Sequence, residues 1–462
     1  MAATLAQAGR AVSILEEGPP IAPGFVPHAP ASIGQLYRNG GLTPVLGTPT
    51  VAFVEGCCVG GSTEVNAGFW HRTPPEVIER WRESARISDF DVASFMATLN
   101  DVERVVGIGQ GPPRVAPDAA SLVLARGAAS LGWRCDEIPR ALWAEDAESE
   151  FRTGARRSAA TTWLPIALAH GATIRTHCRA TNLVHNGQRV RAVECLDTKH
   201  GRPRRLTIEA DHVFVCGGAL QTPTLLARSG ITRNIGHSLR LHLMLKAVAE
   251  FDEALEPRTA VLPVCQIKEH GPDQTLGGSV CTPGFLAITL GDARLASQQA
   301  LHAWRRTALY YTLCRASAPA RVRPFPFTGE AFARYTLTED DRRNLTQGLL
   351  HLCEVLFGAG ARRVYPGLRG WPAFERLAAC REKLSRPLPP RDMSLSSVHA
   401  FSSCPMGEHP RAAVDSLGRL HGFQNLYVAD ASMLPSSPAV NPQATIMTVS
   451  LRNARGLLDG RL

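Results

Sequence analysis

The chain has 462 residues, of which 44% are hydrophobic and 20% are charged. This is more than one typical domain requires, and the balance is that of a soluble globular protein, so we expect two interleaved domains rather than a disordered or membrane-spanning chain. The formal net charge of +9 is not gathered in a long basic run or a nucleic-acid-binding motif. We therefore expect scattered surface charge and no nucleic acid partner, with anionic substrates or partners as a minor possibility.

The twelve cysteines form no CxxC pair and have no regular spacing. This pattern indicates reduced cysteines in the core of a cytosolic protein. No apolar run is long enough to span a membrane, and the first residues lack the basic region of a secretory signal. These features together predict a cytoplasmic location.

The N-terminal residues have the pattern of a helix end followed by a buried strand. Residues 2–9 are typical of a helix, residues 11–15 of a strand, and Glu16 follows the strand. In a dinucleotide-binding fold, an acid at this place holds a ribose hydroxyl, roughly 20 residues after a Gly-x-Gly-x-x-Gly turn. That count runs past Met1, so we expect the first strand and the glycine-rich loop to be missing from the sequence. Taken alone, Glu16 is better explained as an ordinary acid at a strand end.

A glycine-rich segment follows at residues 56–72. Gly60, Gly61 and Ser62 allow backbone amides to approach a ligand closely. Asn66 offers a side-chain amide that could bind a ring carbonyl. Taken alone, a loop of this kind is better explained by a tight turn.

In the middle of the chain, the sequence pattern predicts a helix, a hairpin and a strand that ends in a second glycine turn. Residues 118–131 have an amphipathic helical pattern, and residues 171–197 alternate in two runs around Asn186-Gly187, which predicts a hairpin. A buried strand then ends in a turn at Gly218. Thr222-Pro223 is predicted to open the helix that follows.

The segment from residue 233 to about 390 is predicted to form a second domain on an antiparallel sheet. Thr338 has the residue type and the place of an N-cap for a helix over residues 339–359. Such a sheet could wall a substrate cavity, but the spacing does not identify the residues that line it. The expected strands cover residues 248–251, 260–265 and 309–314.

The C-terminal part of the chain holds a possible base, His399, and an amide, Asn441. Residues 425–429 predict a short buried strand between them. Asn441 and Pro442 have the residue types of an N-cap and a first helical residue, and the helix is expected to end near Gly456. A helix N-terminus beside a histidine can stabilise developing negative charge.

Purely structural roles could also account for these two residues. A single histidine among Ser and Phe residues is more often a hydrogen-bonded structural residue than a base, and capping accounts fully for Asn441. A metal site made of His399, Cys404 and His409 is not expected, because no CxxC or HxxxH spacing relates them.

Three C-terminal motifs together resemble the signature of the glucose-methanol-choline (GMC) flavin oxidoreductases. They are His399-x-x-Ser-Ser-Cys-Pro-Met-Gly407, Val428-Ala-Asp-Ala-Ser432 and Asn441-Pro442. Residues 56–72 resemble the family's flavin-contacting segment, and residues 218–231 resemble its second signature, with Thr232 where a glycine is usual. The resemblance therefore runs over most of the chain.

The resemblance implies an α/β fold. An FAD-binding Rossmann-like domain, with its first strand and glycine-rich loop missing, would be interleaved with an α+β substrate domain built on an antiparallel sheet. The expected FAD-binding parts are residues 1–85, 171–236 and 396–462, and the expected substrate-domain parts are residues 86–170 and 237–395.

The resemblance also implies FAD as the cofactor. The FAD would be held non-covalently, because Val65 stands where some members carry a histidine that links the flavin. Adenine would meet the backbone near Ala180 and Leu183. The expected cofactor-binding residues are Glu16, Gly60, Gly61, Ser62, Asn66, Ala180, Gly218, Asp430 and Pro442.

The reaction implied is oxidation of a small-molecule alcohol. His399 would take the hydroxyl proton, Asn441 would hydrogen-bond the substrate oxygen, and a hydride would pass to flavin N5. An external acceptor, whether oxygen, a quinone or another protein, would reoxidise the flavin. Two alternatives remain: a flavin-free remnant that acts as a binding or interaction protein, and an enzyme that uses a nicotinamide cofactor.

Overall fold

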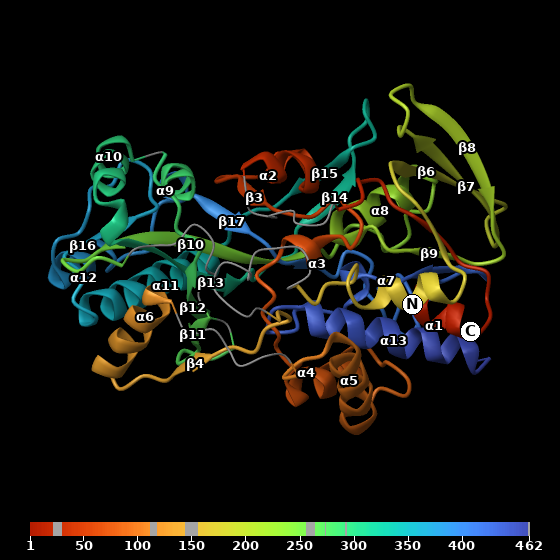
Figure 1. The fold of residues 1–462 in the computed structure, drawn as a ribbon, viewed down its shortest axis with the longest axis horizontal. Coiled ribbons are helices and arrows are strands. Elements are labelled where there is room, and N and C mark those ends of the chain that lie inside the picture. Colours follow the sequence, from red (N-terminus) through yellow and green to blue (C-terminus); the bar gives the residue numbers. More distant parts are fainter. Residues whose placement is uncertain are drawn as a thin grey trace.

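The computed structural model describes residues 1–21, 30–110, 118–143, 156–255, 264–272, 274–291 and 293–460. Within these residues, the chain forms one 12-stranded mixed sheet and three smaller sheets (Figure 1). The large sheet has the order β14 (Arg321–Pro324), β15 (Ala331–Arg334), β2 (Thr43–Leu46), β3 (Val51–Phe53), β17 (Leu395–Ser397), β10 (Arg240–Glu250), β13 (Thr307–Arg315), β12 (Gln274–Ser279), β11 (Cys265–Ile267) and β4 (Cys135–Glu137), with β16 (Arg363–Pro366) and β18 (Ala400–Phe401) also paired to β10.

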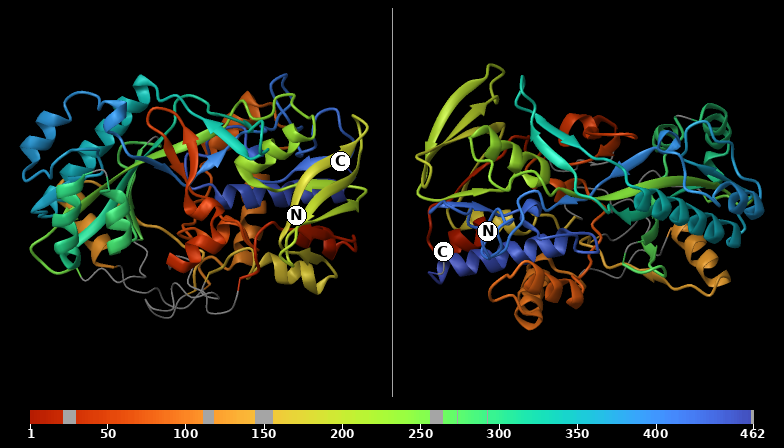
Figure 2. Two further views of the ribbon diagram at one scale, coloured as in Figure 1. Left: turned by 90° about the horizontal axis from the view of Figure 1, so that it is seen from above. Right: turned by 180° about the vertical axis from the view of Figure 1, so that it is seen from behind.

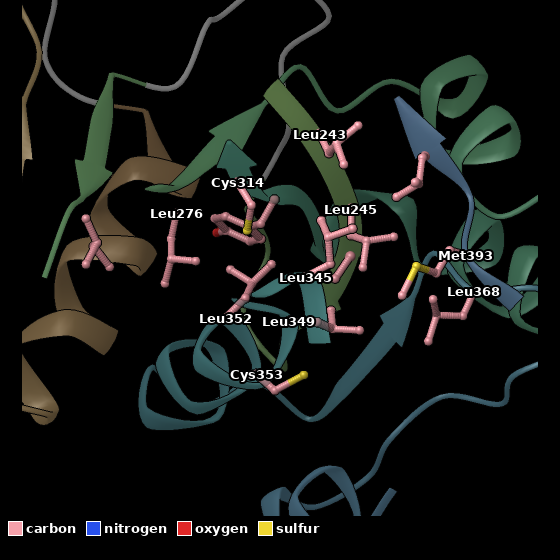
Figure 3. Packing of buried hydrophobic residues seen from close by; sticks show 14 of the residues in the cluster. Leu243, Leu245, Leu276, Cys314, Leu345, Leu349, Leu352, Cys353, Leu368 and Met393 are labelled. Carbon is pink, nitrogen blue, oxygen red and sulfur yellow. The ribbon is translucent and has the colours of Figure 1, made fainter. Parts of the chain in front are cut away.

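Strand β10 is the central strand of this sheet. It runs antiparallel to β13 along one edge, and its other edge pairs with β16, β17 and β18. Because side chains alternate between the two faces of a strand, neighbours along β10 point in opposite directions. Leu243 and Leu245 are buried in the main core with α6 (Ala119–Ser130) and α11 (Glu339–Gly358) (Figure 3). His242 points to the opposite face.

Both of these core helices confirm their sequence-based predictions. Thr338 caps α11 by accepting a hydrogen bond from the Asp341 amide, and the Asp341 carboxylate accepts one from the Thr338 amide in return. The Asp118 carboxylate accepts from the amide of Ser121 at the start of α6. These caps satisfy amides that have no partner within the helix.

The three small sheets lie on the other side of the molecule, where the two chain ends also lie close together (Figures 1 and 2). The hairpin predicted at Asn186-Gly187 and the strand predicted over residues 425–429 are both confirmed. The parallel pairs are β1 (Ser13–Leu15) with β5 (Thr173–Arg175) and β9 (Val213–Val215) with β19 (Leu426–Val428), and the antiparallel sheet is β6 (Cys178–His185), β7 (Val190–Asp197) and β8 (Arg204–Glu209).

A second core joins these small sheets to the surrounding helices. Val190 and Val193 of β7 pack with Val428 of β19, with Trp81 of α4 and with Val449 of α13. The remaining helices are α1 (Ala2–Gln7), α2 (Pro30–Leu36), α3 (Ser62–Val65), α4 (Pro75–Ser84), α5 (Val92–Val106), α7 (Trp163–Ala169), α8 (Gly218–Arg228), α9 (Pro283–Thr289), α10 (Arg294–His302), α12 (Leu377–Lys383) and α13 (Gln443–Leu458).

The predicted start of the helix at Thr222-Pro223 is wrong, because α8 begins earlier, at Gly218, and contains Pro223. A proline inside a helix leaves the carbonyl four residues before it without its amide donor. Here the Ser403 hydroxyl donates to the Ala219 carbonyl at 2.6 Å and supplies the missing hydrogen bond. This contact comes from a distant segment, which local sequence patterns do not reveal.

The predicted start of the last helix is also wrong. Helix α13 begins at Gln443, Pro442 is its N-cap residue, and no side chain caps its first turn. The Asn441 side chain instead turns toward His399. The helix also continues past Gly456 to Leu458.

Two strand predictions need correction. Residues 11–15 form a strand only over Ser13–Leu15, and these residues are exposed or half-buried rather than buried. Among the described residues β1 pairs only with β5, so no strand pairs with its other edge. Of the strand predicted over 260–265, residues 260–263 lie outside the described residues, and β11 begins at Cys265.

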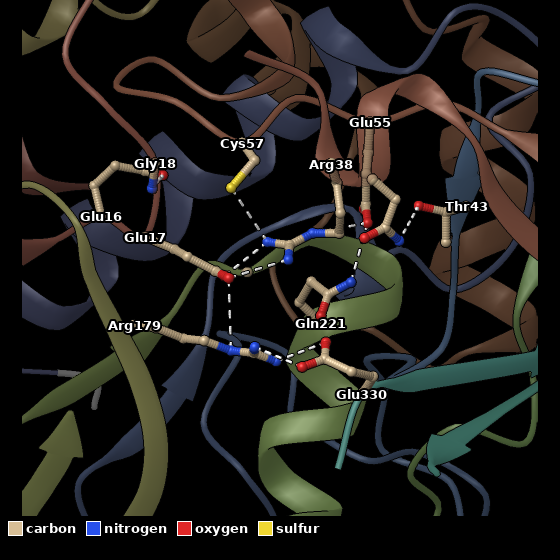
Figure 4. Close-up of polar contacts among 12 residues, drawn as sticks. Glu16, Glu17, Gly18, Arg38, Thr43, Glu55, Cys57, Arg179, Gln221 and Glu330 are labelled. Carbon is tan, nitrogen blue, oxygen red and sulfur yellow. Dashed lines mark hydrogen bonds and ion pairs between the residues drawn. The ribbon is translucent and has the colours of Figure 1, made fainter. Parts of the chain in front are cut away.

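A network of buried charges joins β1, α8 and the edge of the large sheet (Figure 4). Arg38 donates to both carboxylate oxygens of Glu17, at 3.2 and 2.8 Å, and its Nε lies 3.2 Å from Glu55. Gln221 of α8 also donates to Glu55, at 3.0 Å. The Arg38 side chain is 12% exposed and that of Glu55 9%, so this cation neutralises carboxylates that water does not fully solvate.

We expect Arg38→Met to lower the free energy of unfolding by about 3–5 kcal/mol, because breaking a buried pair leaves its carboxylates without compensation. Arg104→Met is the matched control, since Arg104 pairs with Asp101 on the surface at 70% exposure and should cost no more than about 1 kcal/mol. Urea unfolding measures both changes. Equal, small losses in the two variants would contradict the importance of the buried network.

Candidate active site

His399 and Asn441 lie together on the side of β10 opposite the main core. His399 follows β17 and precedes β18, and Asn441 lies just before α13. The amide nitrogen of Asn441 is 3.2 Å from Nε2 of His399. The structure therefore brings together the two residues that the sequence analysis selected as a catalytic pair.

A second histidine, His242 of β10, contacts the same base. Its Nδ1 lies 3.1 Å from Nδ1 of His399, and the two rings meet edge to face. Its backbone amide donates to the carbonyl of His399 at 3.2 Å. Sequence reasoning missed His242, because a lone histidine in an apolar strand carries no local signal of its partner.

With the amide nitrogen of Asn441 turned toward His399, these contacts assign one tautomer to each ring. An amide nitrogen only donates hydrogen bonds, so Nε2 of His399 accepts from Asn441 and its single proton is on Nδ1. Nδ1 of His399 therefore donates to Nδ1 of His242. The proton of His242 is then on Nε2, from which it donates to the Ser437 hydroxyl oxygen at 2.9 Å. The result is an ordered chain from Asn441 through both histidines to Ser437.

Burial keeps both histidines uncharged at neutral pH. Loss of hydration lowers the pKa of His399 to about 4. The same loss of hydration, followed by the proximity of His399 and Arg315, lowers the pKa of His242 well below its ordinary value. A neutral imidazole can accept a proton, so His399 has the protonation state that a general base requires.

The loop that carries Asn441 is held by contacts from two directions. The Ser437 hydroxyl oxygen also accepts from the Ala439 amide at 3.2 Å, and the neighbouring Ser436 accepts from the Trp81 indole at 2.7 Å. Ala439 has a φ of 61°, a conformation that costs energy for a residue with a Cβ and often occurs at functional sites. His242 thus contacts both His399 and the loop of Asn441.

Two glycine turns, one in the glycine-rich segment and one at Gly218, have backbone that no side chain covers. Gly61 has a φ of 58° and Gly218 a φ of 86°, and nothing lies within 4 Å of the place where a Cβ would stand at either residue. Gly60 also has a positive φ, but Glu64 and Ala160 lie close to it. Ser62 starts α3, and its hydroxyl oxygen accepts from the Gly56 amide at 3.0 Å.

Asn66 connects this segment to the start of α13. Its amide nitrogen donates to the Gln443 side chain at 2.7 Å, and its amide oxygen accepts from the Gly68 backbone at 2.8 Å. The side chain thus holds α13 against the glycine-rich segment. Pro442, the N-cap of α13, leaves the first turn of that helix without a side-chain cap.

Asp430 makes its contacts within the protein. Its carboxylate accepts from the Gly218 amide at 2.9 Å, from the Thr222 hydroxyl and from the Ser432 amide at 2.7 Å. These bonds join the end of β19 to the first turn of α8. Any contact of Asp430 with a cofactor would therefore come from its backbone.

Glu16, just after β1, is hydrogen-bonded to the first residue of β6, the strand that carries Ala180. The Glu16 carbonyl accepts from the Cys178 amide at 2.8 Å, two residues before Ala180 in β6. The Glu16 carboxylate accepts from the Gly18 amide at 2.7 Å. A Cβ on Gly18 would lie 2.0 Å from the Cys57 carbonyl, so this turn packs directly on the glycine-rich segment.

These features fit a bound dinucleotide. Gly61 and Gly218 offer backbone that no side chain covers. Helix α13, of sixteen residues, begins without a side-chain cap. Glu16 is an acid at the end of a strand. Helix amides and the helix dipole stabilise phosphate or a reduced ring. FAD, if bound here, would be held by Glu16, by the glycine-rich segment, by Gly218 and by the start of α13.

Other classes of site receive no support from the described residues. Among them, no group of three His, Cys, Asp or Glu side chains could hold a metal ion. No helix in that part of the chain has the length and apolarity to cross a bilayer.

Family models described as GMC oxidoreductase match residues 33–244 and 330–450. An uncharacterized GMC-type oxidoreductase of Sinorhizobium fredii is 34% identical over 99% of this chain and 92% of its own length. The chain belongs to the GMC oxidoreductase family. It is therefore an oxidoreductase, and its membership of this family supports FAD as the cofactor.

Two further similarities extend over nearly all of the chain. A long-chain-alcohol oxidase of Arabidopsis thaliana is 27% identical over 99% of this chain and 66% of its own length. The crystal structure of pyridoxine 4-oxidase from Mesorbium loti matches with a TM-score of 0.75 at 20% identity, covering 99% of this chain and 96% of that chain. At this identity the likeness shows the fold alone, and it confirms the mixed α/β fold class.

We expect FAD affinity to fall as the pH decreases through about 7. Burial raises the pKa of Glu16 to about 7, and only the ionised carboxylate accepts from both ribose hydroxyls. Affinity should level off above that pH, where the group has lost its proton. Fluorescence titration with FAD across pH measures the profile, and Glu16→Gln should flatten it. A native profile that matches that of the variant would contradict the assignment of Glu16.

Proposed function

We propose that this protein oxidises an alcohol with non-covalently bound FAD and with His399 as the base. When bound, FAD supplies the acceptor for the hydride that leaves the alcohol carbon. Val65, which precedes Asn66, has no atom that could form a histidyl link to the flavin. The long-chain-alcohol oxidase and other similar proteins named for oxidation of alcohols support this substrate class.

The observation that carries the proposal is the 3.2 Å contact between Asn441 Nδ2 and His399 Nε2. A hydroxyl group that replaces this direct contact can bind both the amide donor and the ring acceptor. The hydroxyl would donate its proton to Nε2 of His399, and the Asn441 amide would donate to the hydroxyl oxygen. Proton removal increases the negative charge on that oxygen, and the amide stabilises this charge.

His242 serves as a positioning residue in this proposal. Its Nδ1 accepts a hydrogen bond from Nδ1 of His399, which makes Nε2 the accepting nitrogen of His399; in the structure Nε2 accepts from Asn441, and it would accept from the substrate hydroxyl. Its Nε2 donates to Ser437 and fixes the loop that ends in Asn441. A single side chain thus orients both members of the pair, and oxygen, a quinone or another protein would complete the cycle as electron acceptor.

The direct test is His399→Ala. We expect this variant to keep its flavin and to reduce it with substrate about 100-fold or more slowly, which is the scale of a lost general base. Anaerobic stopped-flow absorbance measures the rate. The matched control is His302→Ala, since His302 is exposed at the end of α10. Native reduction rates in the His399 variant would refute its role as base.

The role of His242 requires substitutions that separate its two contacts. His242→Leu removes both contacts and should slow flavin reduction by about 10- to 100-fold, the usual effect of losing a group that orients a reactive one. In His242→Asn, the amide oxygen takes the place of Nδ1 and can still accept from His399, so most of the rate should return. If the Leu and Asn variants were equally slow, a structural defect rather than this hydrogen bond would explain the loss.

A further inference from the structure

The pocket beside the catalytic pair is built on the face of the large sheet that carries His242. Cross-strand pairing places Arg315 directly opposite His242 and Tyr311 directly opposite Lys246. Gln266 of β11 donates to the Tyr311 hydroxyl at 2.8 Å. The residues that line the pocket are His242, Gln266, Lys268, Pro272, Thr275, Tyr311, Leu313, Arg315, Ala439, Val440 and Asn441.

The charges in this lining have one sign. Lys268 and Arg315 both line the pocket, and none of its described lining residues is an aspartate or a glutamate. The chain contains four lysines in all, whereas most of its positive charge comes from arginine. Lys268 lines the pocket and Lys246, a second lysine, lies on the same face of the sheet.

Both lysines are half-buried. Burial lowers the pKa of Lys246 and of Lys268, and for Lys268 the nearby Asp136 partly opposes this shift. In the described part of the chain neither ammonium forms an ion pair or a hydrogen bond. A cation that is removed from water without a partner is costly. An anionic ligand would remove that cost, because it would supply the missing partner.

The pocket adjoins the site of the chemistry. Asn441, which would bind the substrate hydroxyl, is itself a lining residue, and so is His242, which contacts His399. A substrate whose hydroxyl contacts Asn441 and His399 can extend the rest of its structure toward Lys268 and Arg315. A plain alkyl chain in that place would cover two cations with hydrocarbon.

We propose that the substrate is an alcohol that also carries an anionic group, a carboxylate or a phosphate, which Lys268 and Arg315 bind. This inference rests on the proposed alcohol oxidation. It assigns the remote half of the substrate, which the catalytic pair does not determine. Charge-assisted hydrogen bonds from an ammonium and a guanidinium are the strong contacts that proteins use for both anions.

The kinetic test compares primary alcohols with ω-hydroxycarboxylic acids and ω-hydroxyalkyl phosphates of matched, increasing chain length. We expect the value of kcat/KM for at least one anionic series to exceed that of the parent alcohols by about 10- to 100-fold, the effect of one or two charge-assisted hydrogen bonds. Lys268→Gln should remove most of this preference by lowering kcat/KM for the anionic series, with a much smaller effect on the parent alcohols. Lys199→Gln, in an exposed turn, is the matched control and should keep the preference.

Equal kcat/KM values for charged and uncharged alcohols would overturn the inference, as would a Lys268→Gln variant that loses activity equally toward both. Arg315→Gln provides a second variant if Lys268→Gln does not fold. Isothermal titration of the purified protein with butanoate and with butyl phosphate separates this inference from the proposed function. Anion binding that Lys268→Gln weakens supports the pocket even without turnover. Turnover of uncharged alcohols without anion binding supports the proposed function and refutes the pocket.

Discussion

The alternation of side chains along β10 is the constraint on which the site depends. One face of this strand is fixed by Leu243 and Leu245, which are buried under α6 and α11. A register shift by one residue would move these leucines out of the core, so the packing of the core also fixes where His242 points. Hydrophobic burial thus positions a polar group on the opposite face of the strand. His399, the proposed base, is oriented by a side chain whose own place follows from the packing of the core.

The site also depends on contacts between distant segments. Asn66 joins the glycine-rich segment to the start of α13, and Asp430 joins the end of β19 to the first turn of α8. Both side chains direct their polar atoms at protein groups. Their contribution is to hold backbone at Gly61 and Gly218 open toward a ligand. Ser437 also has two partners within the protein: its hydroxyl oxygen accepts from His242 and from the Ala439 amide in the loop that ends in Asn441.

Local sequence patterns predicted what local physics determines. The capped helix after Thr338 and the hairpin at Asn186-Gly187 were both found, because a cap and a tight turn are decided by neighbouring residues. Long-range contacts decided the errors: Ser403 supplies the donor that lets α8 contain Pro223, and His399 draws Asn441 away from capping. His242 was missed for the same reason. The limits of the interleaved domains and the roles of the site residues stay predictions.

The central claim is that His242 holds the proton of His399 on Nδ1, so that Nε2 is the ring nitrogen that accepts. Two-bond proton–nitrogen correlation NMR on protein labelled with ¹⁵N-histidine measures this directly, with the signals assigned through the His399→Ala and His242→Leu variants. At neutral pH we expect an uncharged His399 that carries its proton on Nδ1, and a loss of that single state in His242→Leu. A charged His399, or one with its proton on Nε2, would contradict the account.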